Sequence, residues 1–459
     1  MIENNDILVE GKREVIGEAM SIFSSLGLEA DIAALTKGID KDKIRNSYNT
    51  LFLKEKIAVN SFGVFKDIRK APQSSAYFHI PFCRRQCSYC SYEKMLNPTL
   101  QKRRLYLDFL RREIEAKKKV LKHNLNPDIF YVGGGTPSLL SVAEIEYFLR
   151  LIEEFFDIKN NIEFTFEVSP WSIARPEGIE KLSLLKEYGV NRITVGIESF
   201  SEVVTKKTGR IQLLEDVYKC VVRLKKAAFN TINFDLIYGL PGQDQGLWLE
   251  DLSEAVRLSP DSITTFALRI RDNAPIYRQY MRSPSLLPAE NDKVAMRIMT
   301  VDFLARNNYF EDNSDYFFRK KGKKYLYHPT QPHNISRNLI GFGPSAYSIA
   351  GNTQLFNIRN TDAYLAKIKS NADPIDSVSV LDRQEYMKKR FAEGLRTQFD
   401  DNVFINDFSE SVLGFIPQKI SRLSELGLIH IDGHIIKLTV KGKYITDIIA
   451  NYISYSNTA

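Results

Sequence analysis

Short apolar runs, rich in β-branched and aromatic residues, alternate with longer amphipathic stretches between residues 75 and 270. Roughly 25 to 50 residues separate successive runs, and several intervals carry the pattern of an amphipathic helix. This spacing predicts βαβ crossovers and a parallel sheet, as a partial or full barrel or an open doubly wound sheet. The six predicted strands span residues 76–80, 129–132, 162–167, 192–197, 232–237 and 263–268.

The flanking segments have different patterns. Residues 1–73 read as a helical N-terminal extension, and residues 276–375 as a segment that completes the barrel or covers a substrate. Residues 376–459 alternate helix, helix, hairpin and helix, with Asp432-Gly433 as the turn signal, which suggests a winged-helix-like domain. The parallel sheet would then occupy residues 74–275.

Polar and glycine residues follow the predicted strands at one end. The first strand runs into three cysteines, the second into Gly133-Gly134-Gly135, and the third and fourth end at Glu167 and Glu198. Asp235 lies in the fifth strand. Because chemistry collects at the C-terminal ends of parallel strands, these residues predict one site at that edge.

Composition and charge exclude several classes of protein. The 459 residues include 28 Phe and 22 Tyr, enough to fill a core, and the net charge is only +7. Residues 101–124 are basic, but Leu107, Leu110, Ile114 and Leu121 form the buried stripe of an amphipathic helix with a solvated basic face. No run reaches the roughly 20 apolar residues of a membrane span, and no signal peptide is evident. We therefore expect a soluble cytoplasmic protein without membrane or nucleic-acid partners.

Three of the four cysteines, Cys83, Cys87 and Cys90, lie within eight residues, whereas Cys220 stands alone in a helical stretch as a buried apolar side chain. Such a cluster in a cytosolic chain indicates metal binding or catalysis. Zinc would need a fourth ligand; His79 is nearby, but no second Cys/His pair is present. Three thiolates on a four-iron cluster would leave one iron open to a ligand.

The cysteine loop, with Tyr89 before its last cysteine and a glycine-rich turn after the next strand, resembles the radical S-adenosylmethionine (SAM) superfamily. Further motifs are similar to the oxygen-independent coproporphyrinogen III oxidase-like group: HIPFC, GGGTPS, FEVSP, GIESF, TGR, NFDLIYGLPGQ and GFGPSAYS. The similarity covers about residues 75–350. It favours a partial (β/α) barrel of about six parallel strands, with the helical extension before it and the winged-helix-like domain after it.

The resemblance implies a [4Fe-4S] cluster on the three cysteines, with SAM chelating the open iron. One electron would cleave SAM to methionine and a 5′-deoxyadenosyl radical that abstracts hydrogen from a substrate. A small-molecule substrate and a reductant such as flavodoxin or ferredoxin are the implied partners. The residues assigned to SAM are Tyr77, Tyr89, Gly134, Gly135, Thr136, Glu167, Glu198, Arg210, Asp235 and Tyr347, with Glu198 and Tyr89 also placed in catalysis.

The chain departs from the oxidase at several positions. Tyr92 stands where the oxidase usually has a further Cys, and Glu198 where it tends to have Gln. His333-Asn334 is not followed by the aromatic pair of the relatives, and Trp171 either faces a substrate or packs in the core. These departures lead us to expect a member of the group that is not the oxidase itself.

Three functions remain open. We favour tailoring of an unsaturated small molecule by methylation or cyclopropanation, with one SAM for the radical and a second as donor. The alternatives are a tetrapyrrole enzyme, whether coproporphyrinogen III dehydrogenase-like or heme ring-opening, and a heme chaperone with little radical activity. For a tetrapyrrole, Arg84, Arg85 and the basic run 319–324 could meet propionates.

Overall fold

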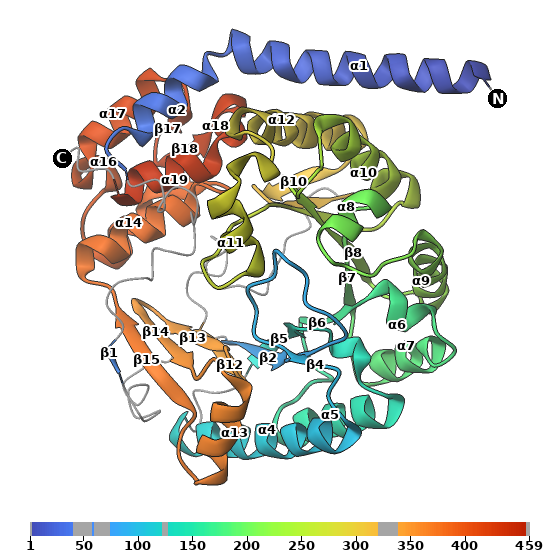
Figure 1. The fold of residues 1–459 in the computed structure, drawn as a ribbon. Helices are drawn as coiled ribbons and strands as arrows, with labels where there is room; N and C mark the ends of the chain where they lie inside the picture. The colour runs from blue at the N-terminus through green and yellow to red at the C-terminus, as the bar shows by residue number, and fades with distance from the viewer. Residues whose placement is uncertain (1, 40–56, 59–73, 122–126, 320–337, 456–459) are drawn as a thin grey trace.

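The computed structural model describes residues 2–39, 57–58, 74–121, 127–319 and 338–455, with side chains from residue 12 onward and without those of 57–58. A 13-stranded mixed sheet runs through it in the order β1-β15-β14-β13-β12-β2-β5-β6-β7-β8-β9-β11-β10 (Figure 1). Its strands are β1 (Ile57–Ala58), β2 (Ser74–Ile80), β5 (Pro127–Gly134), β6 (Glu163–Val168), β7 (Arg192–Glu198), β8 (Thr231–Tyr238), β9 (Ser262–Ala267), β10 (Phe310–Asn313), β11 (Tyr316–Phe318), β12 (Asn338–Phe342), β13 (Tyr347–Ala350), β14 (Thr353–Asn357) and β15 (Ile375–Val380).

The six predicted strands correspond to β2, β5, β6, β7, β8 and β9, which pair in parallel in that order. A seventh parallel strand, β12, pairs with the other edge of β2 and was not predicted. The strands on either side of this parallel unit are antiparallel. The predicted α/β fold is confirmed, but the sheet is larger and more mixed than expected.

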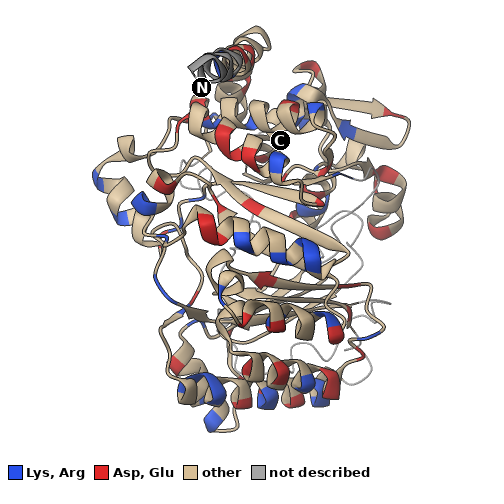
Figure 2. Cartoon of the chain, turned by 90° about the vertical axis from the view of Figure 1, so that its right-hand side faces the viewer, with Lys and Arg blue, Asp and Glu red and all other residues tan. Residues whose placement is uncertain are grey.

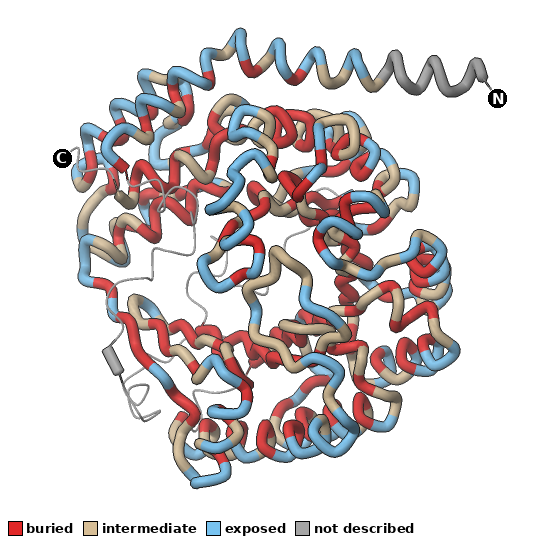
Figure 3. Tube along the Cα trace, in the orientation of Figure 1, coloured by how far each residue is buried: buried red, intermediate tan, exposed pale blue. Residues whose placement is uncertain are grey.

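The two faces of the parallel strands carry different side chains because successive residues point to opposite sides. One face presents Phe78, Phe130, Phe166 and Val195, all fully buried against the outer helices. The opposite face presents polar and aromatic side chains such as Tyr77, toward the interior of the curved sheet. Figure 3 shows the strands as the buried part of the molecule, with helices half-exposed around them.

The helices of the parallel unit lie outside the sheet (Figure 1). They are α4 (Leu100–Leu121), α5 (Val142–Phe155), α6 (Pro170–Ala174), α7 (Gly178–Glu187), α8 (Glu202–Lys207), α9 (Leu214–Ala227), α10 (Gln245–Leu258), α11 (Pro275–Arg282) and α12 (Glu290–Arg306). Leu107, Leu110, Ile114 and Leu121 of α4 are buried as predicted, and so is Cys220 of α9. Figure 2 shows basic and acidic residues interspersed along the helices rather than a surface of one sign.

A buried ion pair anchors α4 to the strands beyond β2. Glu113 accepts hydrogen bonds from the amide of Gly343 (2.7 Å), from Asn357 (2.7 Å) and from the Tyr364 hydroxyl (2.6 Å), and pairs with Lys117 (2.8 Å). Lys117 also donates to the carbonyl of Gly341. The contacts with Gly341 and Gly343 fix the turn between β12 and β13, which carries the predicted motif GFGPSAYS, and those with Asn357 and Tyr364 hold segments further along the chain.

The N-terminal region contributes α1 (Ile2–Ser25) and α2 (Leu28–Thr36), which pack on α12 and on the C-terminal α19. In Figure 1, α1 projects along the top of the molecule. Residues 40–56 and 59–73 of the predicted helical extension lie outside the described residues. Within the described part of the chain, no single helix has the length and apolar character of a membrane crossing; one bent pair, Lys12–Ser25 with Leu28–Thr36, meets the test on length and composition alone.

The C-terminal region has the predicted order of helices and hairpin. Its elements are α13 (Thr361–Lys369), α14 (Arg383–Gly394), β16 (Phe399–Asp400), α15 (Asp401–Phe408), α16 (Val412–Phe415), α17 (Pro417–Glu425), β17 (Ile429–Asp432), β18 (Ile435–Leu438), α18 (Val440–Tyr444) and α19 (Thr446–Tyr455). The hairpin turns at Asp432-Gly433, and β16 adds a third strand. The last helix, predicted as one, divides at Ile445 into α18 and α19.

Candidate functional site

A cavity of about 530 Å³ opens on the interior face of the parallel sheet, at the C-terminal ends of its strands. The cysteine loop between β2 and α4 covers this end and lies at the centre of the ring of elements in Figure 1. The thirteen residues assigned from the sequence to the cluster and to SAM all line this one cavity: Tyr77, Cys83, Cys87, Tyr89, Cys90, Gly134, Gly135, Thr136, Glu167, Glu198, Arg210, Asp235 and Tyr347. Trp171 and Arg84 also line it.

The cysteine loop is held by backbone contacts on three sides. Its base is the short pair β3 (Phe82–Cys83) and β4 (Met95–Leu96). At its tip, Ser88 donates to the carbonyl of Thr208 and accepts from the amide of Ile276 in α11, both at 2.8 Å. The loop is therefore fixed between the end of α8 and the start of α11 rather than hanging in solvent.

The thiols are free, partly exposed to the cavity and mutually close enough to interact electrostatically. Burial raises the pKa of Cys83 to about 11, against a contact of 3.7 Å from the Thr136 hydroxyl, and burial also raises the pKa of Cys90. Within the described residues, no group of three His, Cys, Asp or Glu side chains converges on one metal ion. In an iron–sulfur cluster each thiolate binds a different iron, so three thiols lining one cavity fit that group.

Close protein contacts explain the three glycines in the turn after β5. A Cβ on Gly133 would clash with Glu167, one on Gly134 with the His79 ring, and one on Gly135 with the backbone of Phe82. The amides of Gly134, Gly135 and Thr136 already donate to Glu167, Ile80 and Phe82. These three amides are therefore already engaged by protein acceptors, although the residues line the cavity.

Two short chains of hydrogen bonds orient the side chains at the C-terminal ends of β2, β5 and β6. The Tyr131 hydroxyl donates to Glu167 at 2.6 Å, beside the Gly134 amide at 3.2 Å. Burial lowers the pKa of His79 to about 4, so its ring is neutral near pH 7. Its Nε2 donates to the carbonyl of Glu93 (3.1 Å), which leaves Nδ1 to accept from the Tyr77 hydroxyl (2.9 Å).

Glu198 ends β7 in an unusual backbone conformation. The pairing with β8 skips one residue between Gly196 and Glu198, and Glu198 has φ of 67°, a left-handed value that costs energy for a residue with a Cβ. Its carboxylate lies 3.5 Å from Arg210, which also donates to the Tyr89 hydroxyl at 3.4 Å and to the carbonyl of Gly196. The bulge thus joins three predicted residues, Tyr89, Glu198 and Arg210.

Three carboxyl groups lie together in the cavity, and nearby positive charges and hydrogen bonds only partly offset the cost of burying them. Burial raises the pKa of Glu167 and of Glu198 to about 7 each, and that of Asp235 to about 6. Asp235 adds to the rise at both glutamates, and Arg210 opposes it at Glu198. Desolvated carboxyls in one cleft are typical of a site that receives a ligand with hydrogen-bond donors or positive charge.

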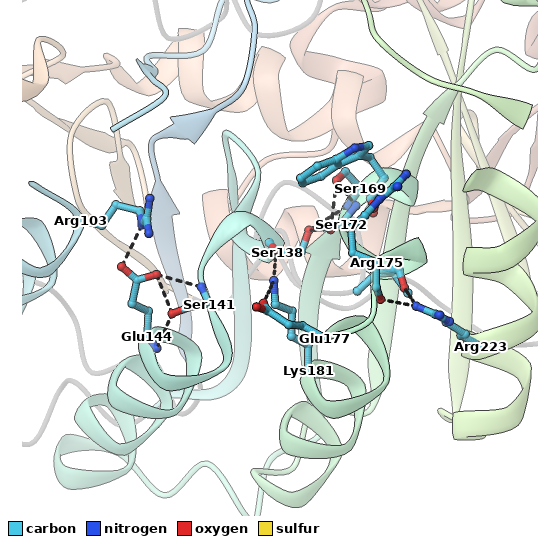
Figure 4. Close-up of polar contacts among 12 residues, drawn as sticks. Arg103, Ser138, Ser141, Glu144, Ser169, Ser172, Arg175, Glu177, Lys181 and Arg223 are labelled. Carbon is cyan, nitrogen blue, oxygen red and sulfur yellow. Dashed lines mark hydrogen bonds and ion pairs between the residues drawn. The ribbon is translucent and has the colours of Figure 1, made fainter. Parts of the chain in front are cut away.

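The wall beside the cysteine loop is built from the turns after β5 and β6. The Ser138 hydroxyl accepts from the amide of Ser169 (3.0 Å) and from Ser172 (2.6 Å), and Lys181 donates to the Ser138 carbonyl (3.2 Å) (Figure 4). This network sets the start of α6, where Trp171 stacks under the Arg84 guanidinium at 3.7 Å from the ring centre. Of the two readings of Trp171, the structure supports the one facing the cavity.

Sequence reasoning missed several cavity residues. Arg269 and Arg271 follow β9, and Arg396 reaches the same space from the C-terminal region. The alternation Leu268, Arg269, Ile270, Arg271 was a usable signal, because two basic residues at every second position point to one side. Two expected features, His333-Asn334 and residues 320–324 of the basic run, lie outside the described residues.

Known proteins share both the sequence motifs and the fold. Residues 77–255 match the radical SAM superfamily. The heme chaperone HemW of Lactococcus lactis is 30% identical over 375 residues, which cover 80% of this chain and 94% of that one. An oxygen-independent coproporphyrinogen III oxidase of Helicobacter pylori is 27% identical over 329 residues, covering 69% and 70%. The structure of coproporphyrinogen III oxidase (HemN) from Escherichia coli shares the fold, with a TM-score of 0.76, 23% identity and coverage of 89% and 96%.

Proposed function

Because the chain belongs to the radical SAM superfamily, in the group of the oxygen-independent coproporphyrinogen III oxidases and HemW heme chaperones, we propose that it is a radical SAM enzyme acting on a tetrapyrrole. One observation carries the proposal. The three free thiols, the strand-end carboxyls and the arginines after β9 line a single cavity. Cluster, SAM and an anionic substrate would meet there.

The chain's own residues divide the work. Cys83, Cys87 and Cys90 would hold a [4Fe-4S] cluster, and Gly135, Thr136, Glu167, Glu198, Arg210 and Asp235 would bind SAM, with Tyr77 and Tyr347 on either side. When bound, the cluster and SAM together supply a hydrogen-abstracting 5′-deoxyadenosyl radical. The protein aligns the reacting atoms and excludes water.

Arg210 and Glu198 form a charge pair, and a bound ligand can add its own contacts to either member. Arg210 is tied to Tyr89 of the cysteine loop and to the carbonyl of Gly196 in β7, so it links loop and strand. A SAM carboxylate beside Arg210 would be balanced by its guanidinium, and an amino or ribose donor beside Glu198 would favour the ionised carboxyl. SAM binding and loop position would thus be coupled through Arg210.

The relatives favour a tetrapyrrole over methyl or methylene transfer. The curated relatives named above are heme chaperones and coproporphyrinogen oxidases, and none of them is a methyltransferase. We therefore set aside the tailoring function that the sequence alone favoured. A tetrapyrrole with propionate side chains would present carboxylates, which the basic side chains of the cavity are suited to bind.

A heme chaperone is the second candidate, and one observation favours it. Tyr92, 60% exposed at the cavity rim, occupies the position of the oxidase's further Cys, and a chain with 30% identity is a heme chaperone. In this case the cavity would bind heme, and its carboxyl groups would take part in little or no catalysis.

The test uses protein reconstituted with iron and sulfide without oxygen, then given SAM and dithionite with either coproporphyrinogen III or heme. Formation of 5′-deoxyadenosine that rises with one tetrapyrrole and is lost in Cys87→Ala supports the enzyme. Stoichiometric heme binding with no 5′-deoxyadenosine above that of Cys87→Ala supports the chaperone. If neither tetrapyrrole binds or reacts while 5′-deoxyadenosine still forms, the radical chemistry stands and the tetrapyrrole assignment falls.

A further inference from the structure

The segment after β9 presents two arginines to the cavity. Leu268 and Ile270 are 7% and 5% exposed and pack in a cluster with Ile276 of α11. Arg269 and Arg271, at the alternate positions, line the cavity instead. The local pattern of the chain therefore directs both guanidinium groups to the space where a substrate would lie, beyond the strand ends.

The first of these arginines is already compensated. Arg269 lies 3.5 Å from Asp447 of α19, and Arg396 pairs with the same Asp447 and with Asp315 at 3.3 Å. Two cations and two anions thus form a closed network between the sheet and the C-terminal region. This network needs no ligand to balance its charge.

Arg271 is different. Its guanidinium has no hydrogen-bond or ion-pair partner among the residues that the structure describes, although the residue is partly buried. Burial lowers the pKa of Arg271, and the neighbouring Arg269 lowers it further. Removing a cation from water without a partner is costly, so an anion arriving at Arg271 would recover that cost.

The other arginines of the cavity are either engaged by protein groups or open to solvent, as Arg85 is on the cysteine loop. Arg210 is engaged by Glu198, Tyr89 and the carbonyl of Gly196, and Arg84 stacks on Trp171. The groups with the strongest electrostatic influence on Arg271, after Arg269, are the phenols of Tyr92 and Tyr347. Both are neutral hydrogen-bond donors; Asp272, the next residue, acts more weakly on Arg271, is exposed to solvent and forms no ion pair with it among the described residues.

We propose that Arg271 is a substrate-binding residue that takes an aliphatic carboxylate of the substrate, with Tyr92 and Tyr347 beside it. A planar guanidinium matches a carboxylate through two parallel hydrogen bonds, a geometry that lysine does not offer. The inference rests on the proposed function, since it assigns one contact of the proposed tetrapyrrole. It orients the substrate with one acidic arm at the end of β9, across the cavity from the glycine turn.

The experiment compares heme with heme dimethyl ester, whose propionates carry no charge, by visible absorbance titration of the cluster-loaded protein. The variants are Arg271→Gln, Arg271→Lys and, as a matched control, Arg278→Gln, an exposed arginine of α11 outside the cavity. Wild type should bind heme about tenfold to a hundredfold more tightly than the ester. Arg271→Gln should lose that preference by weakening heme alone, and Arg271→Lys should keep part of it.

Folding does not obscure this test, because removing an unpaired buried cation leaves no new unsatisfied charge; thermal unfolding of Arg271→Gln should match wild type or exceed it. Equal binding of heme and ester by wild type overturns the assignment of Arg271 while the proposed function stands. Equal weakening of both ligands in Arg271→Gln also overturns it. If no porphyrin binds at all, the result contradicts the proposed function and therefore this inference as well.

Discussion

Two groups of charged residues in this chain differ in how completely the protein neutralises them. Glu113 and Lys117 in α4 are 0% and 1% exposed, and their charges are matched to each other and to four neighbours from three other segments. In the cavity, Glu167, Glu198 and Asp235 are partly buried, and their pKa values rise to about 6 or 7 because desolvation outweighs what their partners return. Arg271 has no partner among the described residues.

This difference distinguishes charges that hold the fold together from charges that are available to a ligand. A buried ion pair with every donor and acceptor used stabilises one arrangement of the chain, here the turn between β12 and β13. Buried charges that lack partners lower stability and persist only where a ligand supplies what is missing. The predictions below test this contrast from the largest expected effect to the smallest.

The cysteine loop gives the largest expected effect. Cys87→Ala should abolish cluster assembly, since a cluster already short of one thiolate loses a second, and iron content with visible absorbance after reconstitution measures it. Cys220→Ala is the matched control, because that thiol is buried in α9 away from the cavity and should leave iron content unchanged. Full iron loading in single Ala variants at all three loop cysteines would refute the cluster site.

Breaking the satisfied pair should cost stability without touching the cavity. Glu113→Gln leaves Lys117 charged in an apolar setting, and we expect a loss of about 3–5 kcal/mol in the free energy of unfolding, measured with urea. The double variant Glu113→Gln with Lys117→Met should recover part of that loss. A loss below about 1 kcal/mol in the single variant would mean that the pair is not a structural anchor.

Glu198, unlike the Glu113–Lys117 pair, should lower the stability of the folded protein as pH rises. Its folded-state pKa of about 7 lies above the ordinary 4.5, so between these values the folded protein keeps a proton that the unfolded chain releases, and stability falls as pH increases. Glu198→Gln removes this contribution. The stability of the variant relative to wild type should rise by about 1–3 kcal/mol from pH 5 to pH 8, measured on cofactor-free protein. A difference independent of pH would contradict the raised pKa.

The smallest effect is expected at the surface. Arg306 of α12 pairs with Glu18 of α1 at 2.9 Å, with side chains 59% and 43% exposed. Solvent and salt screen such a pair, so Arg306→Ala should change the free energy of unfolding by less than about 0.5 kcal/mol. A loss comparable to that of Glu113→Gln would show that exposure is a poor guide to the role of a charge in this chain.

The sequence predicted the part of the site that depends on local pattern. Six strands could be placed because strand alternation and βα spacing are local properties, and the thirteen site residues were assigned from motifs that resemble a known family. The pairing of β12 with β2, the approach of Arg396 and Asp447, and the clash that excludes a side chain at Gly134 depend on contacts between distant segments. Periodicity does not encode such contacts, and Arg271 gained meaning only once its neighbours were known to be paired elsewhere.

The position of β2 has a consequence for how the protein is made. This strand, which leads directly into the cysteines, lies between β5 and β12, and β12 is residues 338–342. During synthesis its second edge therefore stays open until most of the chain has left the ribosome, and such long-range pairing is a slow step in folding. We expect iron and sulfide to be captured after translation, by a chain whose last parallel strand has already paired with β2.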